Sequence, residues 1–393
     1  MTSPLAGITV VAFEQAVAAP YCTRLLGDLG ARVIKVERPG SGDPARHYDT
    51  AANGVATHFA WLNRNKESLT LDFKTAGGRA ALDRLFDQAD VVVQNLAPGA
   101  ARQLGIDAKS LVSARPALVA VDMSGYGTGG PLDHRRAYDL LVQAEAGACA
   151  ITGEDGHPVK PGPLVADVGN GLQAAVSILA ALVARRTSGE GAAIEVGMFD
   201  TVADFIGFAL LHARYTGQER PPIGMSSPVV APYGAYPTRD GHTVVLGTTN
   251  DAEWRRLAGT MLSRPDLLND ETLATNEQRC AQRARLDEAV ATWTSTLDLA
   301  DVMSRADAAG IGSGAYRRVV DVVEHPQLTA RQRWQQVDSP TGPLASLLPP
   351  FVSEGWPVPL RAVPALGEHT GAILTELGLS GEEQVALRDA GAL

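Results

Sequence analysis

Cysteine is scarce in this chain, and the three residues of this type, Cys22, Cys149 and Cys280, stand far apart. None has the short spacing to a second cysteine or histidine that metal sites use, so the sequence predicts no metal site. An odd number of isolated thiols fits a reducing compartment better than secretion. We therefore expect a cytoplasmic protein.

Long basic blocks and membrane segments are absent as well. A net charge of −10 without a basic run makes nucleic acid and anionic membranes poor partners. The first residues, MTSPLAGITVVAFEQ, lack the basic start and long apolar core of a signal peptide. The most apolar run, Leu172 to Val183, contains Gln173 and Ser177, which favours a buried helix over a membrane span.

The chain does contain a regular succession of strand and helix patterns. A β-branched run from Gly7 to Phe13 precedes a helical pattern at 18–29 and a second strand at 32–36, which predicts a parallel α/β sheet. Further strands are expected at 69–73, 91–94, 117–123 and 193–196, with helices at 77–88 and 198–215. Polar or glycine-rich loops follow several strands, and open α/β sheets bind ligands there.

The sequence also argues against a dinucleotide as the ligand of this sheet. Glu37 ends the second strand, where a ribose-binding acid of a dinucleotide site would stand. The first turn, Glu14 to Pro20, has no G-x-G-x-x-G run to admit a pyrophosphate, and no Walker loop occurs. A nicotinamide-dependent enzyme is therefore not expected.

A second pattern begins after residues 217–232, which are rich in proline, glycine and serine and indicate a linker or binding loop. Strands at 234–237 and 243–247 flank an Arg-Asp-Gly turn and predict a hairpin. Helical patterns follow at 252–262, 281–295 and 299–309, so this part is a small α+β domain. Residues 334–359 are expected to be an irregular return, before a terminal helix at 371–377.

Asp167 is the candidate functional residue with the most distinctive setting. It stands in PLVADVGNGLQ, before a long apolar run that predicts a helix. One interpretation makes Asp167 the N-cap of that helix. The other makes it a carboxylate nucleophile, with Gly169 and Gly171 leaving room for a bulky acyl group and the helix N-terminus favouring the ionised form. The stretch alone does not decide between them.

The motifs in their order resemble the class III CoA-transferases, the family of formyl-CoA transferase, which is related to α-methylacyl-CoA racemase. They are PLAGITVV, APYCTRLLGDLGARVIKVERPGSGD, NRNKESLTLDFK, VQNLAPGAARQLGI, SGYGTGGP, RRAYDLLVQAEAG, the Asp167 stretch, APYGAYPTRDG and LGEHT. The resemblance implies a Rossmann-like large domain built from both chain ends, a small α+β domain and an interlocked homodimer. The expected parts are a CoA-binding part at 1–218, the small domain at 219–332, and a return linker with the last part of the large domain at 333–393.

The resemblance also implies a mechanism. The family's acid at the position of Asp167 attacks an acyl-CoA to form a mixed anhydride, and the released thiolate then gives an aspartyl-CoA thioester. No cofactor is expected, because CoA is itself carried between substrates. The family's oxyanion loop corresponds to Gln15, Ala16 and Val17. Formyl-CoA transferase has glutamine at the position of Val17, so only a backbone amide, or Gln15 nearby, could donate here.

CoA carries phosphates and an adenine, which basic side chains bind. By resemblance, Arg38 matches an adenine-side arginine and Lys74 a phosphate-side lysine, while Arg136 replaces a family lysine. Arg102 stands one residue before Gln103, where the family has arginine. Each of these residues, taken alone, also fits a solvated surface position.

Asn95 and Tyr138 match family positions that line the CoA channel. Tyr138 also separates two activities, because racemases of this family carry histidine there as an acid/base group. A phenol with a pKa near 10 is a poor base at neutral pH. The racemase's second acid, which follows a tyrosine, is replaced by Pro237. A racemase is therefore the alternative to a transferase.

The acids exchanged are suggested by residues at the expected acyl end, Arg46, Tyr48 and His58. Arg46 and His58 could hold a distal carboxylate, although a surface arginine and a packed histidine are equally consistent with the sequence. Residues 224–232 replace the glycine-rich lid of formyl-CoA transferase, which argues against oxalate. We expect succinyl-CoA as donor and a short dicarboxylate such as citramalate, itaconate or malate as acceptor. A non-catalytic CoA-binding protein is the third alternative.

Overall fold

The computed structural model describes residues 2–154 and 156–393, which form two compact units. The large unit contains the residues up to Ala148 together with Pro161–Phe208 and Gln332–Leu393. The small unit contains Cys149–Lys160 and Ala209–Arg331.

A six-stranded parallel sheet organises the large unit, in the order β3-β2-β1-β4-β5-β8. Val10 of the central strand pairs with Val33 on one side and Val91 on the other. The strands are β1 (Thr9–Phe13), β2 (Arg32–Glu37), β3 (Lys66–Thr70), β4 (Val91–Gln94), β5 (Val119–Ser124) and β8 (Ala192–Gly197).

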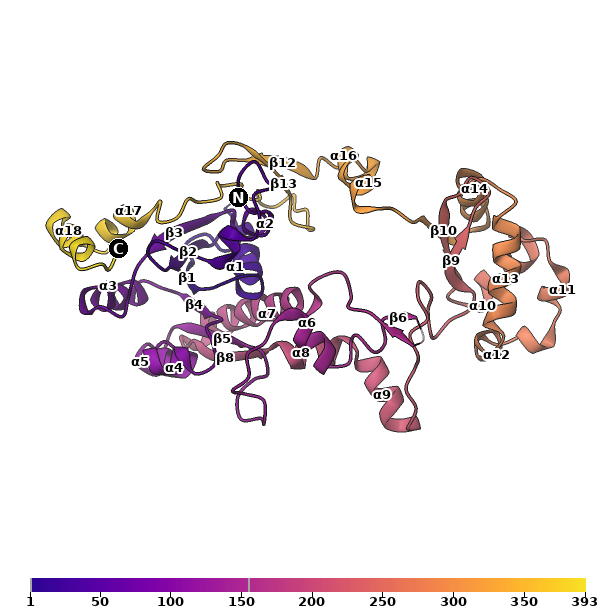
Figure 1. Cartoon of the computed structure of the whole chain (residues 1–393), viewed down its shortest axis with the longest axis horizontal. Helices are drawn as coiled ribbons and strands as arrows, with labels where there is room; N and C mark the ends of the chain where they lie inside the picture. The colour runs from indigo at the N-terminus through magenta and orange to yellow at the C-terminus, as the bar shows by residue number, and fades with distance from the viewer. Residues whose placement is uncertain (1, 155) are drawn as a thin grey trace. The chain divides into compact units, whose positions relative to one another are not determined.

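Helices cover both faces of this sheet, because successive strand residues point to opposite sides. Val10 and Val33 belong to one core with residues of α1 and α7, whereas Val11 and Ile34 belong to the other core with residues of α3, α17 and α18. Figure 1 shows the C-terminal helices, in yellow, beside the early helix α3. The helices of this unit are α1 (Ala18–Asp28), η1 (Pro44–His47), α2 (Thr57–Asn63), α3 (Ala76–Asp87), α4 (Ala100–Leu104), α5 (Ala108–Ala114), α6 (Asp139–Glu145), α7 (Val165–Ser188), α8 (Met198–Phe205), α17 (Thr370–Glu376) and α18 (Gly381–Asp389).

Helix α7 is the longest element, and its 24 residues are long and apolar enough to cross a membrane by length and composition. Its residues Ala174, Ile178 and Leu182 are buried in the same core as strands of the sheet. The apolar character of α7 is thus accounted for on one side by packing against the sheet.

The small unit has its own core between a three-stranded antiparallel sheet and several helices. Val244 and Trp254 lie in this core, and the strands are β9 (Tyr233–Pro237), β10 (Thr243–Gly247) and β11 (Gly312–Ala315). The helical elements are α10 (Asp251–Arg255), η2 (Arg256–Met261), α11 (Pro265–Leu268), η3 (Glu271–Leu273), α12 (Asn276–Ala281), α13 (Arg283–Thr294), α14 (Leu299–Ala309), α15 (Val319–Val323) and α16 (Pro326–Ala330). Two short strands, β6 (Gly153–Glu154) and β7 (His157–Pro158), pair in this unit, and α9 (Gly207–Thr216) spans the division.

Several expected elements differ from the structure. The third strand, β3, begins at Lys66 rather than at residue 69, because buried charged and polar residues hide its start. The helix expected at 198–215 is two helices, α8 and α9. Helix α2 was not expected, and the return expected to be irregular contains a hairpin of β12 (Trp334–Val337) and β13 (Leu344–Leu347).

Candidate active site

The carboxyl ends of β1 and β4 mark the ligand-binding edge of the sheet. The chain moves outward from β1 to β3 and then returns to place β4 beside β1, and a crevice opens at such a switch point. The two loops that follow these strands are joined there. The amide of Gln15 donates to Asn95 Oδ1 at 2.9 Å, and Asn95 Nδ2 donates to the carbonyl of Gln15 at 3.0 Å. Asn95 thus fixes the loop after β1.

That loop, Gln15 to Val17, presents its backbone in an unusual conformation. Ala16 has φ +60°, a left-handed conformation that costs a non-glycine residue energy. Its amide donates to Asp43 Oδ1 at 3.1 Å. Among the described residues, no acceptor is placed on the third amide, that of Val17, whose side chain is buried at the start of α1. One loop amide therefore remains for a ligand.

A cluster of buried charges lies directly beneath this loop. Lys35 Nζ donates to Asp43 Oδ2 at 2.7 Å and to Glu14 Oε1 at 3.2 Å. Lys66 Nζ donates to the same Glu14 oxygen at 2.6 Å, and Thr23 donates to the other. We call Glu14, Lys35, Asp43 and Lys66 the loop-anchoring cluster. It contains two acids and two bases, so its formal charges cancel.

The acid and the two lysines of this cluster that interact most closely are removed from water, and their pKa values reflect both burial and one another's charges. Burial raises the pKa of Glu14, but the charges of Lys35 and Lys66 outweigh burial and lower that pKa below its usual range. Burial lowers the pKa of Lys66 to about 8, against the opposing effect of Glu14. The ion pairs among these residues connect the end of β1 to β2, β3 and the loop after β2.

Arg46 has a different position from the one expected for a substrate contact. Its guanidinium makes two hydrogen bonds to Glu37, of 2.9 and 2.7 Å, and a third to the carbonyl of Pro364 at 3.1 Å. The guanidinium carbon of Arg46 lies over the ring of Phe59, 3.8 Å from the ring centroid. Because all three nitrogens of its guanidinium donate to other parts of the protein, Arg46 stabilises the fold in this position.

Asp167 lies in the first turn of α7, two residues inside the helix, which begins at Val165. The N-cap interpretation is therefore wrong. The cap comes instead from Asp139 of α6, whose Oδ1 accepts from the amide of Ala166 at 3.0 Å and from that of Asp167 at 3.4 Å. The positive end of the helix dipole favours the ionised form of an acid in this turn.

The two glycines after Asp167 pack against other elements, so they do not open space for an acyl group. A Cβ on Gly169 would lie 2.5 Å from the ring of Phe205, and one on Gly171 would lie 2.5 Å from the carbonyl oxygen of Ala18. Gly171 thus lets α7 approach the first turn of α1. Because residues four apart share a helix face, Asp167 lies on the side of α7 that faces the loop before α1.

Tyr48 lies within electrostatic reach of both Asp167 and Tyr138. Burial raises the pKa of Tyr48, and the charges of Asp43 and Asp167 together with Tyr138 raise it further. Both tyrosines expose more than half of their surface, 52% and 63%. The Tyr48 ring stands edge-on to His58 with centroids 5.7 Å apart, and His58 Nδ1 is buried without a partner in the described structure. Tyr48 therefore connects His58 with the surroundings of Asp167.

The basic residues expected to bind CoA are all exposed. Arg38 follows β2, Lys74 follows β3, Arg102 lies on α4 and Arg136 precedes α6. None of the four makes a salt bridge with another described residue. Their positions after carboxyl ends of strands, or near helix starts, fit a ligand that lies along this edge of the sheet.

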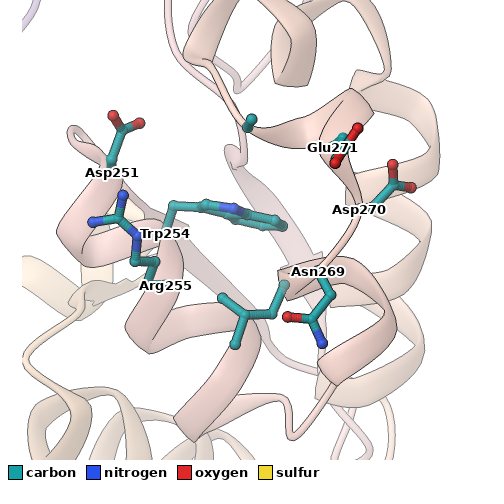
Figure 2. A pocket seen from close by; sticks show the side chains of 8 residues that line it. Asp251, Trp254, Arg255, Asn269, Asp270 and Glu271 are labelled. Carbon is teal, nitrogen blue, oxygen red and sulfur yellow. The ribbon is translucent and has the colours of Figure 1, made fainter.

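A pocket of about 240 Å³ lies elsewhere, in the small unit (Figure 2). The indole of Trp254 forms its floor, with Asp251 and Arg255 on one side and Asp270 on the other. Asp251 pairs with Arg279 at 2.6 Å. No residue expected at the reaction site lines this pocket, and within residues 2–154 and 156–393 no cluster of His, Cys, Asp or Glu is arranged to hold a metal ion.

Sequence reasoning missed Asp139 and the loop-anchoring cluster. A signal for the cluster was available, since Lys35 and Glu37 alternate with β-branched residues in a strand that is buried from Val33 onward. Charges in such a strand need partners. Asp139 had no comparable signal, because its role depends on where α6 lies relative to α7.

Comparisons with known proteins agree with this geometry. The family model of CoA-transferase family III matches residues 5–370. A succinate–glutarate CoA-transferase of Agrobacterium fabrum is 32% identical over 386 residues, covering 95% of this chain and 96% of that protein. A succinyl-CoA–D-citramalate CoA-transferase of Chloroflexus aurantiacus is 32% identical over 393 residues, covering 98% and 97%.

The fold is similar to a solved structure as well. The crystal structure of a CAIB/BAIF family protein from Brucella suis aligns with a TM-score of 0.81 at 32% identity, covering 96% of this chain and 100% of that one. The resemblance read from the motifs is thus confirmed over almost the whole length. The chain belongs to CoA-transferase family III and is an acyl-CoA:carboxylate CoA-transferase.

Proposed function

We propose that this enzyme moves CoA from succinyl-CoA to a short dicarboxylic acid, with Asp167 as nucleophile. The observation that supports the proposal is the place of Asp167 in the first turn of α7, one turn before Gly171, which packs against the start of α1. The loop before α1 contains the amide of Val17, which has no acceptor among the described residues. An attacking carboxylate and a donor for the resulting oxyanion then lie at one edge of the sheet. The alternative of a binding protein needs neither group.

The first half-reaction exchanges one activated carbonyl for another. A carboxylate oxygen of Asp167 attacks the thioester carbonyl, and the C–S bond breaks to give a mixed anhydride and CoA thiolate. The thiolate attacks the aspartyl carbonyl, the C–O bond breaks, and the donor acid leaves as its carboxylate. The acceptor carboxylate attacks the aspartyl-CoA thioester and the same two steps run in reverse, so no net proton, metal or redox group is required.

Each attack places negative charge on a carbonyl oxygen. The backbone amide of Val17 is the donor that the loop leaves available, and one oxyanion donor contributes about 2.7–4 kcal/mol in comparable sites. The amides of Gln15 and Ala16 already donate to Asn95 and Asp43. Asp139, which caps α7, holds Asp167 in place.

The CoA moiety is proposed to lie along the exposed cations Arg38, Lys74, Arg102 and Arg136, with Asn95 and Tyr138 closer to the thioester. Phosphates bind such side chains by charge-assisted hydrogen bonds. The absence of salt bridges among the described residues leaves these four available for a ligand.

Two relatives support a dicarboxylate as the acceptor. One is a succinate–glutarate CoA-transferase and the other is a succinyl-CoA–D-citramalate CoA-transferase. We leave Arg46 out of this proposal, since each nitrogen of its guanidinium donates a hydrogen bond to Glu37 or Pro364. Tyr48 and His58 remain as polar groups for a distal carboxylate.

We further propose that the chain acts as an interlocked homodimer. Leu172, Val176 and Val183 on α7 are exposed by 41, 59 and 67%, and Leu140 and Leu141 on α6 are half exposed. An apolar surface of this kind is covered in stable assemblies. Light scattering after gel filtration, with a value for the monomer as the contradicting result, tests this assembly.

The nucleophile is tested by trapping. Wild-type enzyme incubated with succinyl-CoA and borohydride should be modified at Asp167 in peptide mass spectrometry. Asp167→Asn should lose transfer by several orders of magnitude and still bind CoA. Modification confined to another acid, or undiminished turnover of Asp167→Asn, contradicts the assignment.

The acids are tested with a panel of acceptors and succinyl-CoA as donor. Citramalate, itaconate, malate, mesaconate and glutarate should be faster than acetate, propionate and butyrate. The loss of one charge-assisted hydrogen bond costs about 1.5–3 kcal/mol, or roughly one to two decades in kcat/KM. Equal rates with monocarboxylates contradict the dicarboxylate proposal, and a preference for oxalate contradicts the argument from residues 224–232.

A further inference from the structure

Asp43 connects the buried charges to the loop after β1. Its Oδ2 accepts from Lys35 Nζ at 2.7 Å, and its Oδ1 accepts from the amide of Ala16 at 3.1 Å. The side chain of Asp43 is fully buried. The same Oδ1 also accepts from the amide of Ala45 at 2.9 Å, which fixes the start of η1. One carboxylate thus links the sheet, η1 and the loop.

The loop needs such a link because its backbone is not relaxed. Ala16 at φ +60° would return to a right-handed or extended conformation if nothing held it. Such a rotation about Ala16 would redirect the peptide plane that carries the amide of Val17. The direction of that amide is therefore set by the hydrogen bond between Ala16 and Asp43.

We propose that Asp43 is a positioning residue for acyl transfer, which holds the Val17 amide toward the reacting carbonyl through its hydrogen bond to the amide of Ala16. This inference rests on the proposed function, since it assigns a purpose to the loop only if an oxyanion forms beside it. Asp43 itself touches neither substrate nor the reacting atoms. Its carboxylate acts through the backbone of the loop.

The surroundings of Asp43 allow this role to be separated from a general effect on stability. If Lys35 and Asp43 are neutralised together, Glu14 keeps Lys66 as its partner and Glu37 keeps Arg46. The formal charge of the buried region is then unchanged. What differs between an asparagine and an alanine at position 43 is the acceptor for the amides of Ala16 and Ala45.

The experiment compares Asp43→Asn/Lys35→Met with Asp43→Ala/Lys35→Met, each as the full chain. Steady-state kinetics with succinyl-CoA, urea unfolding, and hydrogen exchange of peptides covering residues 14–18 and 44–48 are measured for both. Exchange at 44–48 reports the loss of the Ala45 hydrogen bond, and exchange at 14–18 reports the loop. The unsubstituted enzyme is the reference.

We expect Asp43→Asn/Lys35→Met to keep kcat within about threefold of the unsubstituted enzyme. Asp43→Ala/Lys35→Met should lose about 10- to 100-fold in kcat, since it leaves the amide of Ala16 without an acceptor and the loop is released. The KM for succinyl-CoA should change by less than about threefold, because the cations that bind CoA are untouched. Exchange at residues 14–18 should rise only in the alanine variant.

Three results would overturn the proposal. They are an unchanged kcat in the alanine variant, an equal loss of kcat in both variants, and a loss of kcat without faster exchange at residues 14–18. Failure of the proposed function is a separate outcome. It would show as an unsubstituted enzyme that transfers no CoA from succinyl-CoA, and the exchange comparison would still test whether Asp43 anchors the loop.

Discussion

The carboxylate of Asp139 accepts a hydrogen bond of 3.0 Å from the amide of Ala166, the residue before Asp167. The first turn of the helix that carries Asp167 is therefore capped by a residue from another helix. Tyr138, next to Asp139 in sequence, lies at the start of α6. Asp139 thus holds the start of α6, where Tyr138 lies, against the first turn of α7, which carries Asp167.

Asp139→Ala should weaken both the helix start and the reaction. Loss of a capping acceptor costs about 0.5–2 kcal/mol of stability, and Asp167 should be trapped by borohydride more slowly. Asp139→Asn, which keeps an acceptor oxygen, is the matched control. Its stability and its rate of trapping should lie between those of Asp139→Ala and those of the unsubstituted enzyme. Urea unfolding and the rate of trapping with succinyl-CoA are the measurements. An Asp139→Ala variant as stable and as fast as the unsubstituted enzyme would contradict the capping role.

Gly171→Ala should separate α7 from α1. The new Cβ would meet the carbonyl oxygen of Ala18 at 2.5 Å, and backbone cannot move aside cheaply. We expect a loss of about 1–3 kcal/mol, as for other overpacked sites. Gly207→Ala is the control, because a Cβ there meets nothing within 4 Å. Unfolding in urea measures both, and equal stabilities of the two variants would argue against close packing at Gly171.

The pair of Glu37 and Arg46 should make the fold sensitive to acid. Burial raises the pKa of Glu37, but Arg46 and Lys35 outweigh it and lower the pKa to about 2, below the usual 4.5. Since the folded-state pKa is depressed, the stabilisation is complete above about pH 4.5 and is lost as pH falls toward 2. Glu37→Gln should flatten the stability curve in this window. Urea unfolding at pH 2–6 measures it, and parallel curves for both proteins would contradict the assignment.

Arg46 should be required for stability and not for the choice of acceptor. Arg46→Met leaves Glu37 buried without its partner, which typically costs about 3–5 kcal/mol. Glu37→Gln/Arg46→Met removes both charges and should recover most of that loss. In either variant that folds, the ratio of rates with citramalate and butyrate should stay unchanged. A ratio that falls toward one in the double variant would return Arg46 to the acyl site.

Transfer without racemisation is expected from Tyr138. A phenol is a poor base at neutral pH and does not remove a proton from a carbon at a useful rate. Incubation of a (2R)-2-methylacyl-CoA in deuterated water, without an acceptor acid, should therefore give no deuterium at the α-carbon. Mass spectrometry of the recovered thioester measures the uptake. Rapid uptake would support the racemase alternative.

The sequence alone determined the kind of fold and the family. Strands such as Val91 to Gln94 are short β-branched runs that are buried on both faces, so local composition identifies them wherever they lie. Asp167 became the candidate nucleophile for a related reason, since an acid at the start of an apolar helix is visible in a single stretch of chain. The order of the motifs identified the family, because each motif is a continuous stretch of sequence and is recognised without the three-dimensional structure.

Only the tertiary structure decided what the charged residues do. Arg46 carries the same charge whether it binds a substrate or Glu37, so its sequence does not identify its partner. In the folded chain its guanidinium also donates to the carbonyl of Pro364, a residue far away in sequence. The start of β3 was hidden for the same reason, because Lys66 is polar by itself and becomes a core residue only where Glu14 meets it. Burial of a charge requires a partner, and the partner is set by the packing of distant strands, so these roles could not be read from local sequence.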